Sequence, residues 1–316
     1  MQAFKPLKQA LSHNFGMPDF TLSRFQITIK LLQSGILPHY KGSCLRGALG
    51  HALRDITCSS GRNSCGGCSE IARCLFTTLF KPDQIPGKSI PAPYLIDPPA
   101  MKETFVTAGT EFSFTLTLFG SAAEQSSVWF KAAQVAGSKF GLGEERILFE
   151  VVKVSGATQD GELLIPLNGS EEIPKITFED VKKHCASTDP CTVKVCLLTP
   201  LKFKDRNEVS STMSGKLFLD TLVRRLKTLS FFYQPGDPFK ELSIDTSQVS
   251  LQKQQLRWVV LERKSMSNPT AINLGGYVGS FELTNITSDI FSLLLLGTYT
   301  HLGKNTVYGC GKYSVS

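Results

Sequence analysis

The sequence predicts an α+β protein built from two tandem domains of the same design. The chain of 316 residues is long enough for about two domains with separate cores. Strand-like alternation and helix-like apolar stripes both occur along it. The same order of elements also occurs twice: a strand, a helix, further strands, a second helix, a glycine-rich loop and a closing strand. A unit this long that recurs once indicates a duplicated domain rather than a solenoid of short repeats.

The first copy opens with a strand at 21–30, where apolar and polar residues alternate, and a helix at 42–57. Apolar side chains recur along one stripe of that helix, which is typical of a helix packed against a sheet. Strict alternation then predicts a half-buried strand and a strand pair. The later elements of this copy are expected at 104–107 and 110–119 (strands) and 125–136 (helix), followed by a first glycine loop with glycines at 137, 141 and 143 and a closing strand up to 154.

The second copy opens with a strand at 192–198 and a helix at 215–229. Paired strands are expected at 255–264 and 275–283, and the stretch 293–315 predicts a helix end, a glycine-rich loop and a closing strand. A polar stretch rich in glycine, proline and serine separates the two copies. The resulting boundaries are domain one at 1–160, a linker at 161–190 and domain two at 191–316.

The glycine-rich loop near the end of the second copy is a candidate ligand site. It contains Gly303, Gly309 and Gly311, with Lys304 and Lys312 among them. Glycine allows positive φ and a close approach of the backbone to a ligand, and successive N–H groups can hold phosphate oxygens. The spacing matches neither the dinucleotide-binding fingerprint nor the P-loop. The alternative is ordinary turn chemistry without a ligand.

Composition and charge restrict the function classes. The chain has 34 basic and 27 acidic residues, a net charge of +7, which permits an anionic partner without demanding one. Its apolar runs are all too short to cross a membrane. The first residues show no secretory signal pattern, so we expect a cytoplasmic protein without membrane contact.

Basic residues in domain two would form a positive track for nucleic acid if they converge in the fold. Dispersed surface charge is the alternative, and the sequence does not decide between them. The residues concerned are Lys202, Lys204, Arg206, Arg224, Arg225, Arg257, Arg263 and Lys264.

Four cysteines form an insertion in domain one, at Cys58, Cys65, Cys68 and Cys74. The inner pair has the two-residue spacing of one knuckle of a tetrahedral metal site. The intervening polar residues cannot form a core, and a metal ion would replace one. We expect a structural zinc ion, with an iron–sulfur cluster as the less favoured choice. Reduced thiols or a disulfide pair are the alternative.

One histidine of the first helix is a candidate for chemistry. His51 lies roughly 200° around the helix from Leu49, so it points away from the apolar stripe. Gly47 and Arg54 share its face. An imidazole beside an arginine and a small residue could act on a phosphodiester, and a plain surface histidine is the alternative.

Six stretches together resemble the CRISPR-associated endoribonucleases that process precursor CRISPR RNA, within the RAMP superfamily. The resemblance covers nearly the whole chain, is weakest before residue 20 and across 156–190, and is most specific in the C-terminal glycine motif. The stretches are 45–53, 58–74 with Leu79 and Phe80 after it, 93–99, 140–146, 274–279 and 301–311.

This resemblance implies two tandem ferredoxin-like (RRM/RAMP) domains, each with an antiparallel sheet backed by helices. It also implies cleavage of repeat RNA without a metal or other cofactor in the chemistry. In such a reaction a base removes the proton of a ribose 2′-hydroxyl, which attacks the adjacent phosphate. The products are a 2′,3′-cyclic phosphate and a 5′-hydroxyl. The nucleophile restricts the substrate to RNA.

The resemblance places the general base in or near the first helix, so His51 is the first candidate. His39 is the competitor, because Tyr40 and Lys41 beside it would supply an acid and a cation. His301 would orient RNA or the glycine loop. The residues expected to contact RNA are Arg46, Arg54, His301, Gly303, Lys304, Gly309, Gly311, Lys312, Lys202, Lys204 and Arg206.

A second function from another class is a catalytically silent RAMP subunit that binds RNA within a CRISPR effector complex. It would share the fold and the positive track but would not cleave. Under either function the expected partners are CRISPR repeat RNA and other Cas subunits, and the chain would be a monomer or a homodimer.

Overall fold

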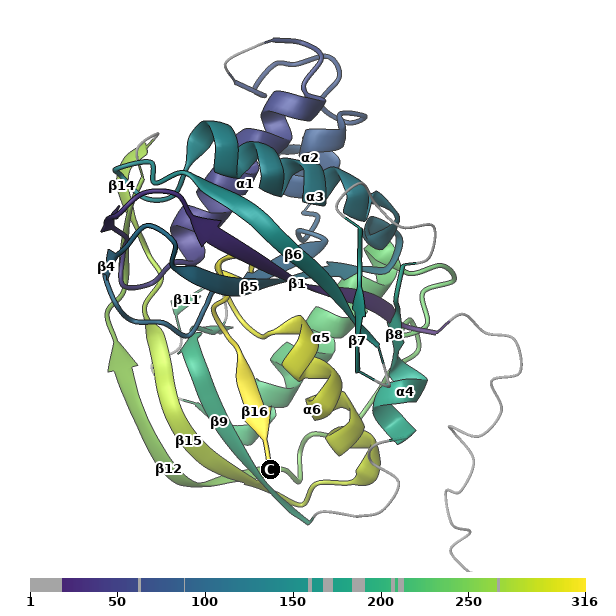
Figure 1. Cartoon of the computed structure of the whole chain (residues 1–316). Helices are drawn as coiled ribbons and strands as arrows, with labels where there is room; N and C mark the ends of the chain where they lie inside the picture. The colour runs from purple at the N-terminus through teal and green to yellow at the C-terminus, as the bar shows by residue number, and fades with distance from the viewer. Residues whose placement is uncertain are drawn as a thin grey trace, which may run out of the picture.

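The computed structural model describes most of the chain. The described residues are 19–61, 64–87, 89–158, 161–166, 173–183, 191–205, 208–209, 213–265 and 268–316. None of the helices within these ranges combines the length and the apolar character that crossing a membrane requires. Figure 1 shows the whole chain.

The first sheet is antiparallel and has β1 at its centre. Its order is β3-β5-β1-β6-β7, and β8 pairs with one end of β1. Alternate β1 residues, among them Phe25, Ile27 and Ile29, are fully buried because the period of a strand sends them to one face. The strands are β1 (Thr21–Leu31), β3 (Tyr94–Asp97), β5 (Glu111–Phe119), β6 (Phe149–Thr158), β7 (Gly161–Leu164) and β8 (Ile176–Thr177).

Two helices cover one face of this sheet, α1 (Gly42–Thr57) and α3 (Ser126–Val135) (Figure 1). The buried stripe of α1 includes Leu45, Leu49 and Leu53, which belong to the same core as β1. The short helix α2 (Leu75–Phe80) adds Phe76, Leu79 and Phe80 to that core. Domain one is thus a sheet with one helical layer.

The second domain repeats this design. Its sheet has the order β12-β15-β9-β16 and is also antiparallel. The helices α5 and α6 pack on one face, and each begins with a hydroxyl cap, Ser214 for α5 and Thr287 for α6. The elements are β9 (Thr192–Leu201), α5 (Gly215–Tyr233), β12 (Ser250–Val259), β15 (Gly276–Thr284), α6 (Ser288–Thr300) and β16 (Tyr313–Val315).

The two sheets share one topology, which confirms the predicted duplication. In each domain the first strand lies between the third and the fourth, and the second strand lies outside the third. One helix follows the first strand and another follows the third. This is the βαββαβ order of the ferredoxin-like fold, so the predicted tandem α+β architecture is confirmed.

The remaining elements are short. They are β2 (Gly35–Ile36), β4 (Phe105–Val106), α4 (Phe178–Lys183), β10 (Lys204–Asp205), β11 (Glu208–Val209), β13 (Glu262–Ser265) and β14 (Asn268–Asn273), with the turns η1 (Pro82–Gln84), η2 (Gly120–Gln125), η3 (Ala136–Phe140) and η4 (Thr306–Tyr308). The strand expected at 104–107 is β4, and it pairs with β2 rather than with β5.

The segment 161–190, expected as a linker, contains regular structure in its described part. It holds β7, β8 and α4. Ile176, Phe178 and Val181 are buried in the core of the second domain. Because polar and charged residues separate these apolar side chains, the polar composition of the whole segment does not reveal that they are buried.

The domains also pack on each other. Four apolar residues of domain one pack in the core of domain two, under α5 and α6: Phe20, Leu22, Leu95 and Phe119. The two helices consequently lie between the first sheet and the second (Figure 1). Residues from both domains therefore meet along a buried junction.

Candidate active site and domain junction

An exposed imidazole on α1 lies against an aromatic ring of the first glycine loop. The His51 ring stacks on Phe140, with centroids 5.7 Å apart and planes 22° apart. Phe140 ends η3, a turn of π-helix that continues α3, and Gly141 follows it at φ +67°. A π-helical turn shifts the side chains after it around the axis, and such turns are frequent at functional sites. Here the turn sets Phe140 against His51.

Positive charges surround His51. Partial burial lowers the pKa of this imidazole, and the charges of Lys81, Arg146 and Arg54 lower it further. These cations come from the end of α2, the glycine loop and α1 itself. A histidine with a lowered pKa is neutral at pH 7 and can accept a proton. The same cations attract a phosphate.

The surface beside His51 is open on one side and occupied on another. A Cβ atom built on Gly47, one turn earlier in α1, meets no atom within 4 Å. On the other side Lys139 holds the carboxylate of Asp55 at 2.7 Å. Lys139 is thus partly neutralised.

His39 is exposed in the loop before α1, but its neighbours point inward. The Tyr40 hydroxyl donates to the Tyr308 carbonyl oxygen at 2.8 Å, and burial, followed by Cys310, raises its pKa. Lys41 is buried and its ammonium donates to three backbone carbonyl oxygens, at 2.8 to 3.3 Å. These contacts do not fit the expected roles of Tyr40 as an acid and Lys41 as a cation at the site. Both side chains instead hold the loop in place.

A buried ion cluster lies at the junction of the domains. Asp97, at the end of β3, is 3.1 Å from His301 Nε2, 3.3 Å from Lys312 Nζ and 3.4 Å from Arg24. Burial alone would raise the pKa of Asp97, but the charges of His301, Lys312 and Arg24 outweigh it and hold the pKa well below its usual range. The contact at Oδ1 is electrostatic rather than a well-aligned hydrogen bond.

His301 belongs to this junction rather than to an open surface. It is 1% exposed and has φ +53°, at the end of α6. Its Nδ1 lies 3.2 Å from the Cys310 carbonyl oxygen, and its Nε2 faces Asp97. Both neighbours are acceptors and hold the ring at the junction. His301 orients the glycine loop.

The glycines of that loop meet this chain's own backbone. A Cβ on Gly309 would collide with Pro98 and the Ile96 carbonyl oxygen, and one on Gly311 would collide with the Leu302 carbonyl oxygen. Gly303 faces the Lys202 carbonyl oxygen in the same way. All three have positive φ. We expected this loop to bind phosphate with exposed backbone N–H groups. In the structure Gly309 and Gly311 are instead buried between elements of the protein.

Arg46 also works at the junction. Its guanidinium lies between the rings of Phe80 and Tyr308, 4.5 and 4.7 Å from their centroids, and its Nε donates to the Tyr94 hydroxyl at 3.1 Å. Tyr308 belongs to domain two, whereas the other two belong to domain one. Stacking on both rings links the two domains. Arg46 was expected to contact RNA, but in the structure its guanidinium contacts side chains of the protein.

Two cations of the expected positive track in domain two donate to backbone oxygens of the chain itself. Lys202 donates to the Asn273 carbonyl oxygen at 3.1 Å, and Arg225 is buried and donates to Thr300. Lys304 is exposed. The side chain of Lys204 and all of Arg206 lie outside the described residues.

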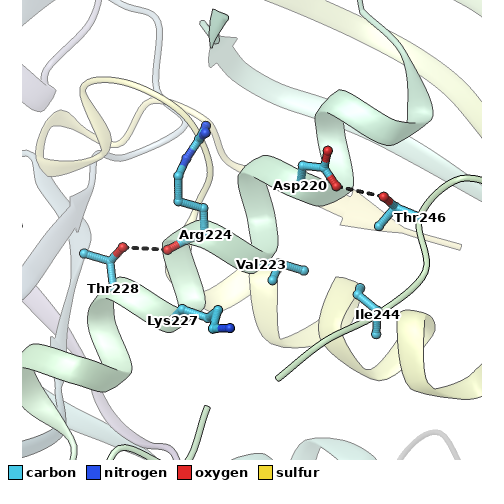
Figure 2. A pocket seen from close by; sticks show the side chains of 7 residues that line it. All are labelled: Asp220, Val223, Arg224, Lys227, Thr228, Ile244 and Thr246. Atoms are coloured by element: carbon cyan, nitrogen blue, oxygen red, sulfur yellow. Dashed lines mark hydrogen bonds between the residues drawn. The ribbon is translucent and has the colours of Figure 1, made fainter. Parts of the chain in front are cut away.

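A groove of about 370 Å³ lies along α5, on a different element from the histidines. Figure 2 shows the side chains that line it. Its carboxylate, Asp220, contacts Lys216 and Thr246, and Lys227 donates to the Leu242 carbonyl oxygen. Arg224 points away from these groups in the figure. The polar groups are satisfied by the protein, so this groove carries no candidate site.

The four expected metal ligands lie together. Cys58, Cys65, Cys68 and Cys74 all line one small cavity beside the end of α1. Within the described residues they form no disulfide, and no group of three or more potential ligands is already arranged around a metal position.

Sequence reasoning missed several residues of these sites. Asp97 and Lys81 were not candidates, because their partners come from distant parts of the chain. Phe140 and Arg146 lie in the first glycine loop. The similarity of this loop to the second one was the only sequence feature that could have marked them as candidates. Their approach to His51 depends on the π-helical turn, which the local pattern does not mark.

Family models match both halves of the chain. The model AF_1859_N, described as an N-terminal domain, matches residues 20–177. The model for the CRISPR-associated endoribonuclease Cas6 matches residues 195–313. An uncharacterized protein of Archaeoglobus fulgidus is 24% identical over 289 residues, which cover 88% of this chain and 92% of that protein.

Solved structures share the fold at low identity. A partial Cas6-RT-Cas1–Cas2 complex matches 95% of this chain at a TM-score of 0.60 and 13% identity, and this chain spans 46% of that one. A Cas6 product complex matches 94% of this chain and 100% of its own, with a TM-score of 0.55 and 15% identity. Thermus thermophilus Cas6 matches at 0.52 and 14% identity, covering 94% and 99%.

The duplicated topology, the family models that match both domains and the shared fold agree with one another. Residues 195–313 match the Cas6 endoribonuclease family, and this match together with the shared fold supports a CRISPR-associated Cas6-type RAMP protein.

Proposed function

We propose that this chain is an endoribonuclease that cleaves precursor CRISPR RNA within its repeats, with His51 as the general base. The match to the Cas6 endoribonuclease family supports the reaction and its substrate. The observation that carries the assignment to His51 is its setting: an exposed imidazole with a lowered pKa, among cations from three separate elements. No other described histidine combines exposure with such a setting.

The reaction starts at a ribose 2′-hydroxyl. Neutral His51 takes the proton from this hydroxyl, and the oxygen attacks the adjacent phosphorus in line. The bond from phosphorus to the 5′-oxygen breaks. The products are a 2′,3′-cyclic phosphate and a 5′-hydroxyl, which need neither water nor a metal ion in this step.

Lys81, Arg54 and Arg146 supply the remaining chemistry. Their charges stabilise the negative charge that grows on the phosphorane. Burial, followed by the charge of Arg46, lowers the pKa of Lys81 from its ordinary value. A lysine with a lowered pKa gives up its proton more readily, so Lys81 is our candidate for the acid that protonates the 5′-oxygen.

Substrate and partners follow from the same assignment. A phosphate that reaches His51 lies on domain one, on the face of α1 opposite its buried stripe. Similar structures include a Cas6-RT-Cas1–Cas2 complex, and on that likeness we propose other Cas proteins as partners. Cytoplasmic location agrees with such partners.

The test is cleavage of CRISPR repeat RNA in the presence of a chelator. The purified chain is mixed with a panel of repeat RNAs and EDTA for minutes, and the 3′ ends of the products are identified by mass spectrometry. We expect a 2′,3′-cyclic phosphate. The same samples are assayed for bound zinc. If cleavage stops, this assay shows whether EDTA has also removed zinc from the protein.

Matched variants assign the base and the acid. Loss of the base in His51→Ala should reduce cleavage by about 10²–10⁴-fold while binding is kept, and His39→Ala should retain cleavage. Lys81→Ala should reduce cleavage, with Lys139→Ala as a control because Lys139 is paired with Asp55. Binding of every repeat without any cleavage would instead support a silent subunit. If His39→Ala reduces cleavage more than His51→Ala does, the general base is His39 in the loop before α1.

A further inference from the structure

We propose that Cys58, Cys65, Cys68 and Cys74 bind one zinc ion, which replaces a hydrophobic core for the segment 58–74. This inference is independent of the RNA chemistry. The four residues come from three separate places: Cys58 follows α1, Cys65 and Cys68 belong to one turn, and Cys74 precedes α2. All four nevertheless line the same cavity.

The size of this cavity suits a single bound atom. Its volume is about 10 Å³, which is room for roughly one water-sized sphere. The rest of its lining is mixed, with polar and apolar side chains: Arg54, Ser60, Ser64, Ile71, Phe76 and Thr77. Four thiolates around one small cavity match the tetrahedral preference of zinc.

The inner pair already has the backbone shape of a metal knuckle. The Cys68 N–H donates to the Cys65 carbonyl oxygen at 3.1 Å, which closes a four-residue turn. Gly67 occupies the third position of this turn at φ +70°, a conformation that glycine adopts without strain. The turn brings the two cysteines to the same side of the chain, as a two-residue spacing requires.

The segment has little else to hold it. Of its described residues, only Cys65 and Cys74 pack against the core of domain one. In Figure 1 the segment projects from the helices of domain one, away from the second sheet. A bound metal would therefore supply the cross-links that apolar contacts do not.

Zinc would draw the four thiols inward. In the described part of the chain they are not already arranged as a closed coordination sphere. Because Cys74 directly precedes α2, a closed sphere would also fix the start of that helix. Phe80 at the end of α2 stacks on Tyr94, 5.4 Å between centroids, so the ion would stabilise the domain-one side of the junction.

The experiment measures metal directly in the full chain, produced with both zinc and iron supplied. We expect one zinc per chain by elemental analysis, and X-ray absorption showing four sulfur ligands at about 2.3 Å. The double variant Cys65→Ser with Cys68→Ser should lose the metal. Cys196→Ser is the matched control, because Cys196 lies on β9 in the other domain, and it should keep the zinc.

A second readout keeps the proposal testable if the double variant is unstable. Limited proteolysis should cut the zinc-free variant within 58–74 and leave the native segment intact. Native protein that is free of zinc and has four reduced thiols would overturn the proposal. So would iron with inorganic sulfide, or a disulfide among the four cysteines. None of these outcomes depends on whether the chain cleaves RNA.

Discussion

Removing the carboxylate at the domain junction should destabilise the whole protein. Asp97→Asn keeps the shape of the side chain but removes a charge that faces His301, Lys312 and Arg24. At 3.3 Å and an effective dielectric constant of about 20, the pair with Lys312 is worth about 5 kcal/mol before desolvation is counted. Breaking a buried pair from one side costs about 3–5 kcal/mol. Lys312 and Arg24 are 31% exposed, so we expect about 3 kcal/mol.

The pH dependence of this effect has a defined sign. The pKa of Asp97 is lower in the folded state than in the unfolded chain. Its contribution to stability is therefore fully present above the unfolded value of about 3.9 and is lost as pH falls toward the folded value. The difference between native protein and the Asp97→Asn variant should be constant at neutral pH and shrink in acid.

Urea unfolding at pH 7 measures the effect, followed by circular dichroism and by tryptophan fluorescence. The two tryptophans report on different domains, Trp129 in the core of domain one and Trp258 on β12. The control is Glu150→Gln, which breaks an exposed pair with Lys30 at 3.8 Å and should cost at most about 1 kcal/mol. If Asp97→Asn costs no more than the control, the cluster does not hold the domains together.

Four further predictions concern single residues. Gly309→Ala should cost at least about 2 kcal/mol in chemical denaturation, because φ is +84° and the backbone of domain one leaves no room. Gly47→Ala, in an open helical position, should instead gain about 0.5–1 kcal/mol in the same assay. Lys41→Met strips the ammonium from three carbonyl oxygens and should lower stability by about 1–3 kcal/mol, seen as a lower melting temperature. The rate of RNA cleavage should fall in acid with a midpoint below 6.5, because the base form of His51 persists to lower pH than that of an ordinary histidine; a midpoint above 6.5 would contradict that role.

The architecture could be predicted from the sequence because strands and helices leave local signatures. Alternation along β1 and β5 and the apolar stripe of α1 each arise from the geometry of one element. The repeated order of these elements then fixed the topology, since each strand pairs according to its place in the unit. The structured segment with β8 and α4 escaped prediction because few of its residues are apolar and their partners lie in the other domain.

The sites were predicted less completely, for a physical reason. A glycine at positive φ serves equally well beside a phosphate or beside another strand, so the pattern at Gly309 could not separate these uses. Tyr40 and Lys41 have catalytic chemistry, but only the fold shows that their polar atoms are already bonded. His51 was placed on the correct face because the angle around a helix is a local property. Its cations come from α2 and the first glycine loop, which only tertiary structure brings near.

The backbone contact between the glycine loop and residues 96–98 has a consequence for protein engineering. Chimeras that join domain one of this chain to domain two of a relative would inherit the two sides of this contact from different parents. Gly309 has no side chain with which to adapt to a foreign neighbour at Ile96 or Pro98. Exchange of the two stretches as a linked pair should therefore give folded hybrids more often than exchange of either one, which a library scored by soluble expression would reveal.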